Sequence, residues 1–123
     1  MVKNAALPVG QRVRIDSDVM VAGHHGANNA CSAPFIRAVS PTFVVFSAGH
    51  KFKHPRALTA QRFLSNGVSV DHILRTDEGD NEGGTEWDAR STGHRDPRGD
   101  DDVEITVQKG VGSSAGTLDI HYR

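Results

Sequence analysis

Short apolar runs, rich in β-branched and aromatic residues, recur along the first two thirds of the chain. They predict buried strands at 18–22 (DVMVA), 43–46 (FVVF) and 70–75. A further short run, Val13–Ile15, alternates with arginines and predicts an edge strand. The spacing between these runs leaves room for a helix on each side of the FVVF run.

Two segments between the strands have apolar residues near helical spacing. Ser32 is a suitable N-cap for a helix over 33–39, because its side chain can accept a hydrogen bond from the first turn. Pro55 precedes a second helix over 56–65, and Asn66-Gly67 is a typical C-terminal cap. The order strand, helix, strand, helix, strand predicts an α/β layer.

After residue 77 the chain becomes strongly acidic. Eleven acidic residues lie between Asp77 and Glu104, and only three arginines oppose them. Like charges this closely spaced resist compaction, so we predict a long surface loop over 78–101. Trp87, the only tryptophan, lies within this stretch, and we expect its ring to pin the loop to the body of the protein.

The C-terminal residues alternate between apolar and polar. This pattern predicts two half-buried strands, at 103–107 and 118–122, joined as an antiparallel hairpin by the turn at 110–116. We therefore predict one domain over 1–123, with a core formed by 13–77 and 102–123.

Composition narrows the class of protein. Apolar residues make up 37% of the chain, charged residues 24%, and the net charge is −1. This balance is typical of a soluble domain, which we expect to be cytoplasmic, and it gives no electrostatic case for general nucleic-acid binding. No apolar run approaches the ~20 residues that a membrane-spanning helix needs. The single cysteine, Cys31, excludes an internal disulfide, and we expect an inert thiol.

Histidines follow two successive predicted strands. Gly23-His24-His25-Gly26 ends the first run, and His50 and His54 follow the FVVF run. If the two strands are adjacent and parallel, both pairs lie at the same edge of the sheet, where α/β proteins bind ligands. Imidazole is a common zinc ligand, but surface loops also carry histidines without a function, and the pattern leaves both interpretations open.

Between residues 18 and 77, several short motifs occur in an order that is typical of one family. The segment resembles the closing part of ComEC-like metallo-β-lactamase domains, which run from GHHGS through a helix, SP, an apolar strand and HPHP to RTD. The corresponding motifs here are Gly23-His24-His25-Gly26, Ser40-Pro41, Phe43 to Gly49, His54-Pro55 and Arg75-Thr76-Asp77. The resemblance implies the C-terminal half of an αββα sandwich, with one mixed sheet, two helices and a C-terminal hairpin.

The resemblance also implies roles for individual residues. In such domains a histidine of the GHHG loop completes a two-metal site of zinc or manganese, which hydrolyses phosphodiesters or related esters. Metal ligation then falls on His24 or His25, with His24 preferred and His25 also a catalytic or substrate-facing candidate. His54 is the second catalytic candidate and would contact the substrate phosphate, together with Arg56 and His50.

The chain departs from the family pattern in important places. Ala27 replaces the serine after GHHG, and Arg56 replaces the second histidine of HPHP. The HxHxDH motif of the family's N-terminal half, and its bridging aspartate, have no counterpart here. Because a catalytic zinc needs about three protein ligands, we expect this chain to be inactive as a hydrolase on its own.

Three hypotheses remain open. The chain is a piece of a metal-dependent hydrolase, a non-catalytic interaction or oligomerisation domain that reuses half the fold, or a protein that binds metal between two copies. A single sheet would leave an apolar face uncovered, including part of Phe43–Phe46. We therefore predict a homodimer, or association with the missing N-terminal half.

Overall fold

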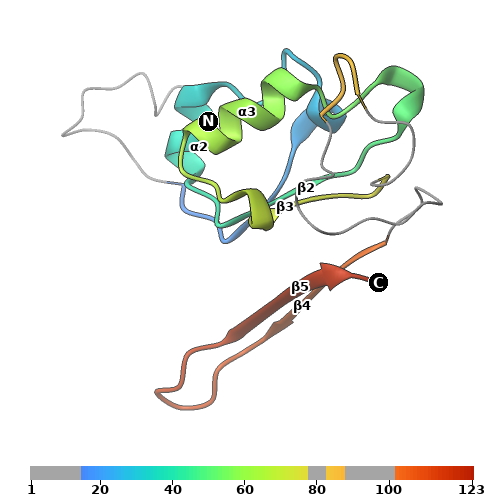
Figure 1. Cartoon of the computed structure of the whole chain (residues 1–123). Helices are drawn as coiled ribbons and strands as arrows, with labels where there is room; N and C mark the ends of the chain where they lie inside the picture. The colour runs from blue at the N-terminus through green and yellow to red at the C-terminus, as the bar shows by residue number, and fades with distance from the viewer. Residues whose placement is uncertain (1–14, 78–82, 88–101) are drawn as a thin grey trace.

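The computed structural model describes residues 15–77, 83–87 and 102–123, and the elements below refer to these ranges (Figure 1). They contain two α-helices, five short strands and three single 3₁₀ turns. The strands are β1 (Val19–Val21), β2 (Phe43–Phe46), β3 (Ile73–Arg75), β4 (Val103–Gln108) and β5 (Thr117–Tyr122). The helices are α2 (Ala33–Val39) and α3 (Ala57–Ser65), and the 3₁₀ turns are η2 (Gly23–Gly26), η3 (His50–Phe52) and η4 (Val70–His72).

Three of the strands form a parallel sheet in the order β1-β2-β3. Val19 pairs with Phe43 and Val45 pairs with Leu74. The prediction that the first two strands are adjacent and parallel is therefore confirmed. Both connections carry a helix and step in the same direction, so right-handed crossovers place α2 and α3 on one face of the sheet, as Figure 1 shows.

The hydrophobic core lies between this sheet and the two helices. Phe46 and Phe63 are fully buried and meet edge to face, with ring centroids 5.8 Å apart. Each contributes roughly 1.5–3 kcal/mol by leaving water. Trp87 packs against the same core, 6.4 Å from the Phe46 ring, which confirms the expected pinning. The remaining core residues are Met20, Ala22, Ile36, Val39, Val44, Ala60, Val68 and Ile73.

The predicted helices are confirmed with small changes at their ends. The helix over 33–39 has the predicted bounds, and the Ser32 hydroxyl accepts the Phe35 N–H at 3.4 Å. The second helix begins at Ala57, one residue later than expected, and ends as predicted at Ser65, with Asn66 as its C-cap.

Two strand predictions need correction. The run 70–75 is a strand only from Ile73, because pairing with β2 begins there, where Ile73 lies opposite Val44. The preceding residues form η4, at whose start the His72 N–H donates a hydrogen bond to the Ser69 carbonyl. In the expected edge strand at 13–15, residues 13 and 14 lie outside the described ranges, and Ile15 belongs to no strand.

The single mixed sheet is also corrected, because β4 and β5 form a separate antiparallel sheet. The link to the parallel sheet is a side-chain bond, in which the Arg75 N–H donates to the Tyr122 hydroxyl at 2.9 Å. The Tyr122 hydroxyl thus satisfies a strand N–H that a ladder partner would otherwise take. In Figure 1 the hairpin extends away below the parallel sheet.

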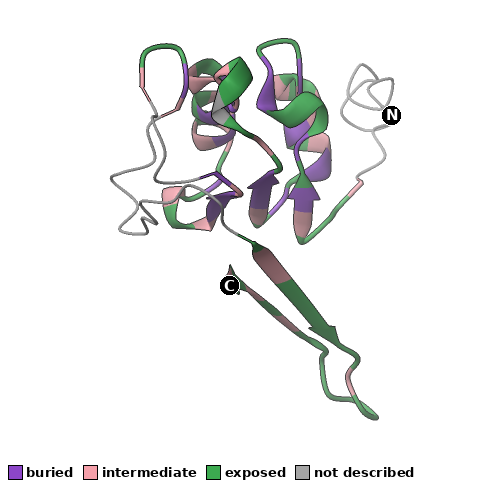
Figure 2. Cartoon of the chain, turned by 90° about the vertical axis from the view of Figure 1, so that its right-hand side faces the viewer, coloured by how far each residue is buried: buried purple, intermediate pink, exposed green. Residues whose placement is uncertain are grey.

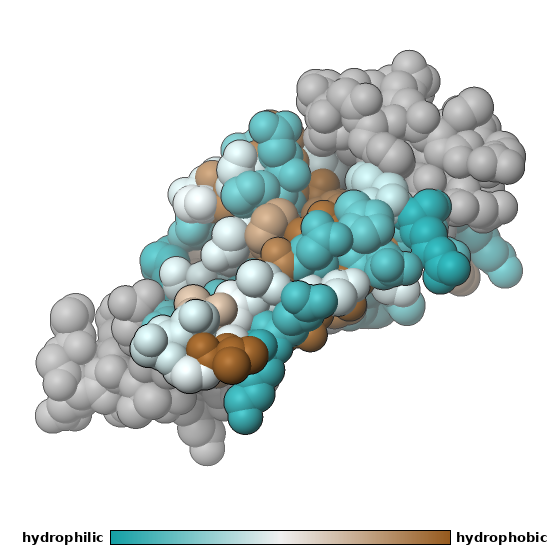
Figure 3. Space-filling view, turned by 90° about the horizontal axis from the view of Figure 1, so that it is seen from below, coloured by the Kyte–Doolittle hydropathy of each residue, from teal (hydrophilic) through white to brown (hydrophobic). Residues whose placement is uncertain are grey.

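The hairpin has one apolar face and one polar face. Cross-strand pairs Val103–Tyr122, Ile105–Ile120 and Val107–Leu118 lie on the apolar face, while Glu104–His121 and Thr106–Asp119 lie on the other. Ile105 is 40% exposed and Val107 73% exposed, and Figure 2 shows how little of the hairpin is buried. Seen from below, hydrophobic side chains reach the surface among polar ones (Figure 3).

Candidate functional site

The carboxyl ends of the three parallel strands meet at one rim of the sheet. The GHHG turn η2 follows β1, and the segment that leads to His54 follows β2. The ring centroids of His24 and His54 lie 6.0 Å apart, and those of His25 and His54 lie 6.5 Å apart and nearly parallel. The structure thus brings together three of the residues that the sequence nominated.

The backbone of the GHHG turn is left-handed throughout its centre. His24, His25 and Gly26 have φ of 50°, 55° and 83°. For a residue with a Cβ this conformation costs roughly 1–2 kcal/mol, and such strain is often found at functional sites. Two bonds hold the turn in place: Arg56 N–H donates to the Gly26 carbonyl at 2.9 Å, and the buried Thr59 hydroxyl donates to the Ala27 carbonyl at 2.8 Å.

An oxygen atom fixes the tautomer of each histidine in the doublet. His25 Nδ1 lies 2.6 Å from the Ser47 carbonyl oxygen, which only accepts, so Nδ1 carries the proton. His24 Nδ1 lies 3.0 Å from Asn29 Oδ1, with the same consequence. The lone pair of each neutral ring is then on Nε2. An oxygen partner at the second ring nitrogen is typical of metal-binding histidines.

The surroundings of His54 favour its neutral form. Partial burial lowers the pKa of His54, and the nearby charges of Arg56, His24 and His25 lower it further. A neutral imidazole is the form that binds metals or accepts protons. The peptide bond between His54 and Pro55 is cis.

Arg56 is held by part of the stretch that the sequence predicted to be a solvated acidic loop. The Arg56 guanidinium donates from Nη1 to the Thr85 hydroxyl. The backbones also pair, since Ala57 N–H donates to the Thr85 carbonyl at 2.9 Å and Trp87 N–H to the Pro55 carbonyl at 2.8 Å. Residues 83–87 are therefore docked along the HPHP-like segment.

The fully buried side chain of Arg75 explains this docking. Its Nε donates to Asp77 Oδ1 at 2.7 Å, its Nη2 to Glu86 Oε1 and its Nη1 to the Trp87 carbonyl. Nη2 also lies 3.4 Å from the His54 carbonyl oxygen. Glu86 is only 2% exposed, so the expectation of a solvated loop is wrong for this side chain, whereas the neighbouring Thr85 is exposed. Residues 78–82 and 88–101 lie outside the described ranges.

Arg75 stays charged in this buried environment. Burial acts to lower the pKa of Arg75, but the hydrogen bonds and charges of Asp77 and Glu86 outweigh it, and the net effect is a raised pKa. Sequence reasoning included Arg75 and Asp77 only as members of the RTD motif. The part played by Glu86 had no local signal, because nothing distinguishes it from its acidic neighbours.

The histidine side chains described at the rim are of a type that binds metals, but too few of them are close enough together to form a metal site. Among the described residues, no three or more His, Cys, Asp or Glu side chains are placed to hold a metal ion together. Two imidazoles on one zinc, with bonds of about 2.1 Å, have ring centroids roughly 5 Å apart. The observed distances from His54 to His24 and His25, 6.0 and 6.5 Å, are wider, so His54 is not placed to share one zinc ion with either of them. The side chain of His50, the remaining nominated residue, lies outside the described part of the structure.

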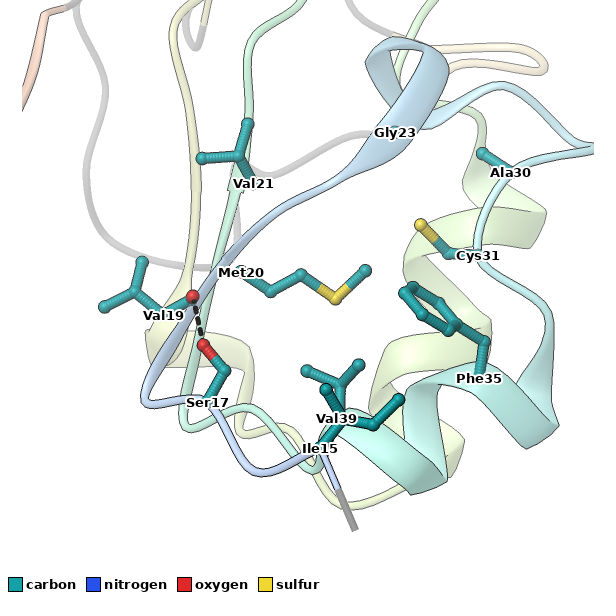
Figure 4. A pocket seen from close by; sticks show the side chains of 10 residues that line it. All are labelled: Ile15, Ser17, Val19, Met20, Val21, Gly23, Ala30, Cys31, Phe35 and Val39. Carbon is teal, nitrogen blue, oxygen red and sulfur yellow. Dashed lines mark hydrogen bonds between the residues drawn. The ribbon is translucent and has the colours of Figure 1, made fainter. Parts of the chain in front are cut away.

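A hollow lies between β1 and α2, and Gly23 of the GHHG turn is among its lining residues. It has a volume of about 390 Å³, and Met20, Cys31, Phe35 and Val39 are among its lining residues (Figure 4). Burial raises the pKa of the Cys31 thiol, against the lowering effects of a backbone hydrogen bond and of Arg62. The thiol is therefore protonated at neutral pH, which agrees with the expectation of an inert cysteine.

Within the described ranges no helix is both long and apolar enough to span a bilayer.

Comparison with known proteins finds similarity to one curated protein. Over 63 residues, half of the chain, the sequence is 41% identical to "Competence protein ComA" of Neisseria gonorrhoeae. The matched region spans 9% of that protein's length. The similarity supports a ComEC-related origin, but it does not establish a metallo-β-lactamase fold. No protein-family model matches the chain, and no solved structure matches it.

Proposed function

We propose that this chain is the C-terminal part of a ComEC-like, metal-dependent hydrolase of phosphodiesters or related esters, and that it is inactive alone. The observation that supports this most directly is the convergence of His24, His25 and His54 at one rim. The similarity to a competence protein adds a role in competence-related DNA uptake, with DNA as the source of the phosphodiester.

In this proposal some of the histidines at the rim bind the metal and others bind the phosphate. His24 is a metal ligand, and His25 is a second ligand or a catalytic group facing the substrate. His54 and Arg56 hold the phosphate, and His50 is a further candidate for this role. Bound zinc or manganese would supply an activated water. The remaining ligands would come from a second copy or from the N-terminal half of an αββα sandwich, of which this chain would supply one part.

A metal and an anion should bind to this rim with opposite dependence on pH. A metal competes with protons for Nε2 of His24 and His25, so its affinity falls as pH falls. A tetrahedral anion of constant charge is attracted by protonated imidazoles, so its affinity rises as pH falls. Sulfate keeps its double charge over this range, whereas phosphate takes up a proton, so sulfate is the suitable analogue for this comparison. The two ligands therefore report on different side chains of the same rim: the metal on His24 and His25, and the anion on His54.

We expect calorimetric titration of the whole chain to show this opposition between about pH 7.5 and pH 5.5. Zinc binding should weaken toward the acidic end, and binding of sulfate, as an analogue of phosphate with constant charge, should strengthen. The double variant His24→Ala/His25→Ala should lose zinc binding, while the control His121→Ala, on the exposed hairpin, should keep it. Zinc binding that persists in the double variant, or sulfate binding that does not change with pH, would contradict the proposal.

A specific observation also favours the interaction hypothesis. Val21 is 60% exposed on β1, and a hollow of about 450 Å³ separates β1 from the apolar side of the hairpin. Residues Val19, Ile105, Val107 and Leu118 line this hollow. Exposed apolar faces of this kind often mark protein interfaces. We propose that a second copy, or the missing half of the fold, covers it.

Light scattering after size-exclusion chromatography tests the homodimer. We expect the whole chain to elute as a dimer at high protein concentration. Val107→Asp, on the apolar face of the hairpin, should shift the protein toward monomer, because a carboxylate would be buried in the interface. Thr106→Lys, on the polar face of the same strand and opposite Asp119, is the control that adds a charge without placing like charges across the strands, and it should leave the dimer intact. A folded monomer of the unmodified chain would argue against self-association.

A further inference from the structure

Residues Gly83–Trp87 lie beside the candidate phosphate-binding residues His54 and Arg56. Arg56 and Glu86 form an antiparallel bridge, and the Glu86 N–H closes a turn onto the Gly83 carbonyl at 3.2 Å. The segment therefore has a defined backbone conformation next to the rim.

Two side chains of this segment act on the rim in different ways. Glu86 is buried and binds the Arg75 guanidinium, which also donates to the His54 carbonyl oxygen. It thereby anchors the segment and the backbone of His54 to the same cation. Thr85 is exposed, and its hydroxyl accepts a hydrogen bond from Arg56 Nη1. An exposed hydroxyl of this kind adds little to fold stability.

The contact between Thr85 and Arg56 matters more for preorganisation. A long arginine side chain has many rotamers, and fixing one of them on binding costs free energy. An arginine that is already held presents its guanidinium to a phosphate without that cost, and fixed orientation is what bidentate recognition requires. The second imidazole of the family's HPHP motif is absent here, so a flexible cation stands where a stiff ring would be.

We propose that Thr85 is a positioning residue that holds Arg56 at the phosphate-binding rim, on a segment anchored by Glu86. This inference rests on the proposed phosphate-binding role of Arg56 and adds to it the residue that orients the guanidinium. It gives part of the acidic stretch a function in ligand binding and not only in packing.

The test compares Thr85→Val, which keeps the shape but removes the hydroxyl, with Thr85→Ser, which keeps the hydroxyl. Inorganic phosphate binding to the whole chain should weaken roughly three- to tenfold in Thr85→Val and recover in Thr85→Ser. The Arg56 Nε–H signal in ¹⁵N NMR spectra should be distinct in the original and Ser proteins. It should broaden or move to the position of a free arginine in the Val protein. Urea unfolding should be nearly unchanged.

An Arg56→Ala variant separates failure of this inference from failure of the proposed function. If Arg56→Ala weakens phosphate binding and Thr85→Val does not, Thr85 is not a positioning residue, while the role of Arg56 stands. If Arg56→Ala binds phosphate as well as the original protein, both the role of Arg56 and the inference are overturned.

Discussion

Replacing Arg75 with methionine is expected to destabilise the fold by about 3–5 kcal/mol, because the buried carboxylates of Asp77 and Glu86 lose the guanidinium that both bind. Glu86 would keep its longer contact with the partly exposed Lys53, at 3.9 Å. Arg75 is fully buried, and Asp77 and Glu86 are 4% and 2% exposed. A small domain has a total stability of about 5–15 kcal/mol, so the loss would remove much of it. Urea unfolding followed by circular dichroism gives the measurement.

Two further variants identify the cause of this loss. Arg75→Lys keeps a positive charge but lacks the planar fork that reaches Asp77 and Glu86 together, so it should recover only part of the stability. Adding Asp77→Asn and Glu86→Gln to Arg75→Met removes the uncompensated charges and should also recover part of it. If Arg75→Met unfolds at the same urea concentration as the original protein, the ion cluster is not what holds this region together.

The Arg75 cluster also shows where sequence reasoning stops. Hydrophobic periodicity identified α2, α3, β1 and β2 almost to their ends, because each is defined by neighbouring residues that bury one face. The burial of Glu86 depends instead on a guanidinium eleven residues earlier in the chain. Net charge predicted solvation for the whole stretch, but one well-placed cation outweighs a local excess of like charge.

In the sheets and the site, too, features set by neighbouring residues could be predicted, whereas features set by distant contacts could not. Alternation predicted β4 and β5 correctly, but alternation specifies which face is apolar and not which sheet a strand joins. For the site, the positions after β1 and β2 were sufficient to bring His24, His25 and His54 to one rim, because parallel topology fixes that edge. The hydrogen-bond partners of those rings, Asn29 and Ser47, needed coordinates.

The turn that carries the histidine doublet depends on one glycine. Gly26 has φ of +83°, and a Cβ at this position would lie 2.6 Å from Pro55 Cβ and 2.7 Å from the Phe46 ring. The Phe46 ring is in the core and fully buried, so it has little room to move. Both the backbone conformation and the close approach therefore require glycine here.

We expect Gly26→Ala to destabilise the protein by about 2–4 kcal/mol, the sum of a left-handed residue with a Cβ and an overpacked contact. The matched control is Gly23→Ala in the same turn, where a Cβ would meet nothing within 4 Å, and it should cost much less. Relief of the clash would move the turn away from Pro55 and break the bond between the Arg56 N–H and the Gly26 carbonyl. His24 and His25 would then separate from His54, so Gly26→Ala should also weaken zinc and phosphate binding. Equal urea midpoints for the two alanine variants would mean that the turn is not wedged against Pro55 and Phe46. The positions of the histidines at the rim would then not depend on Gly26.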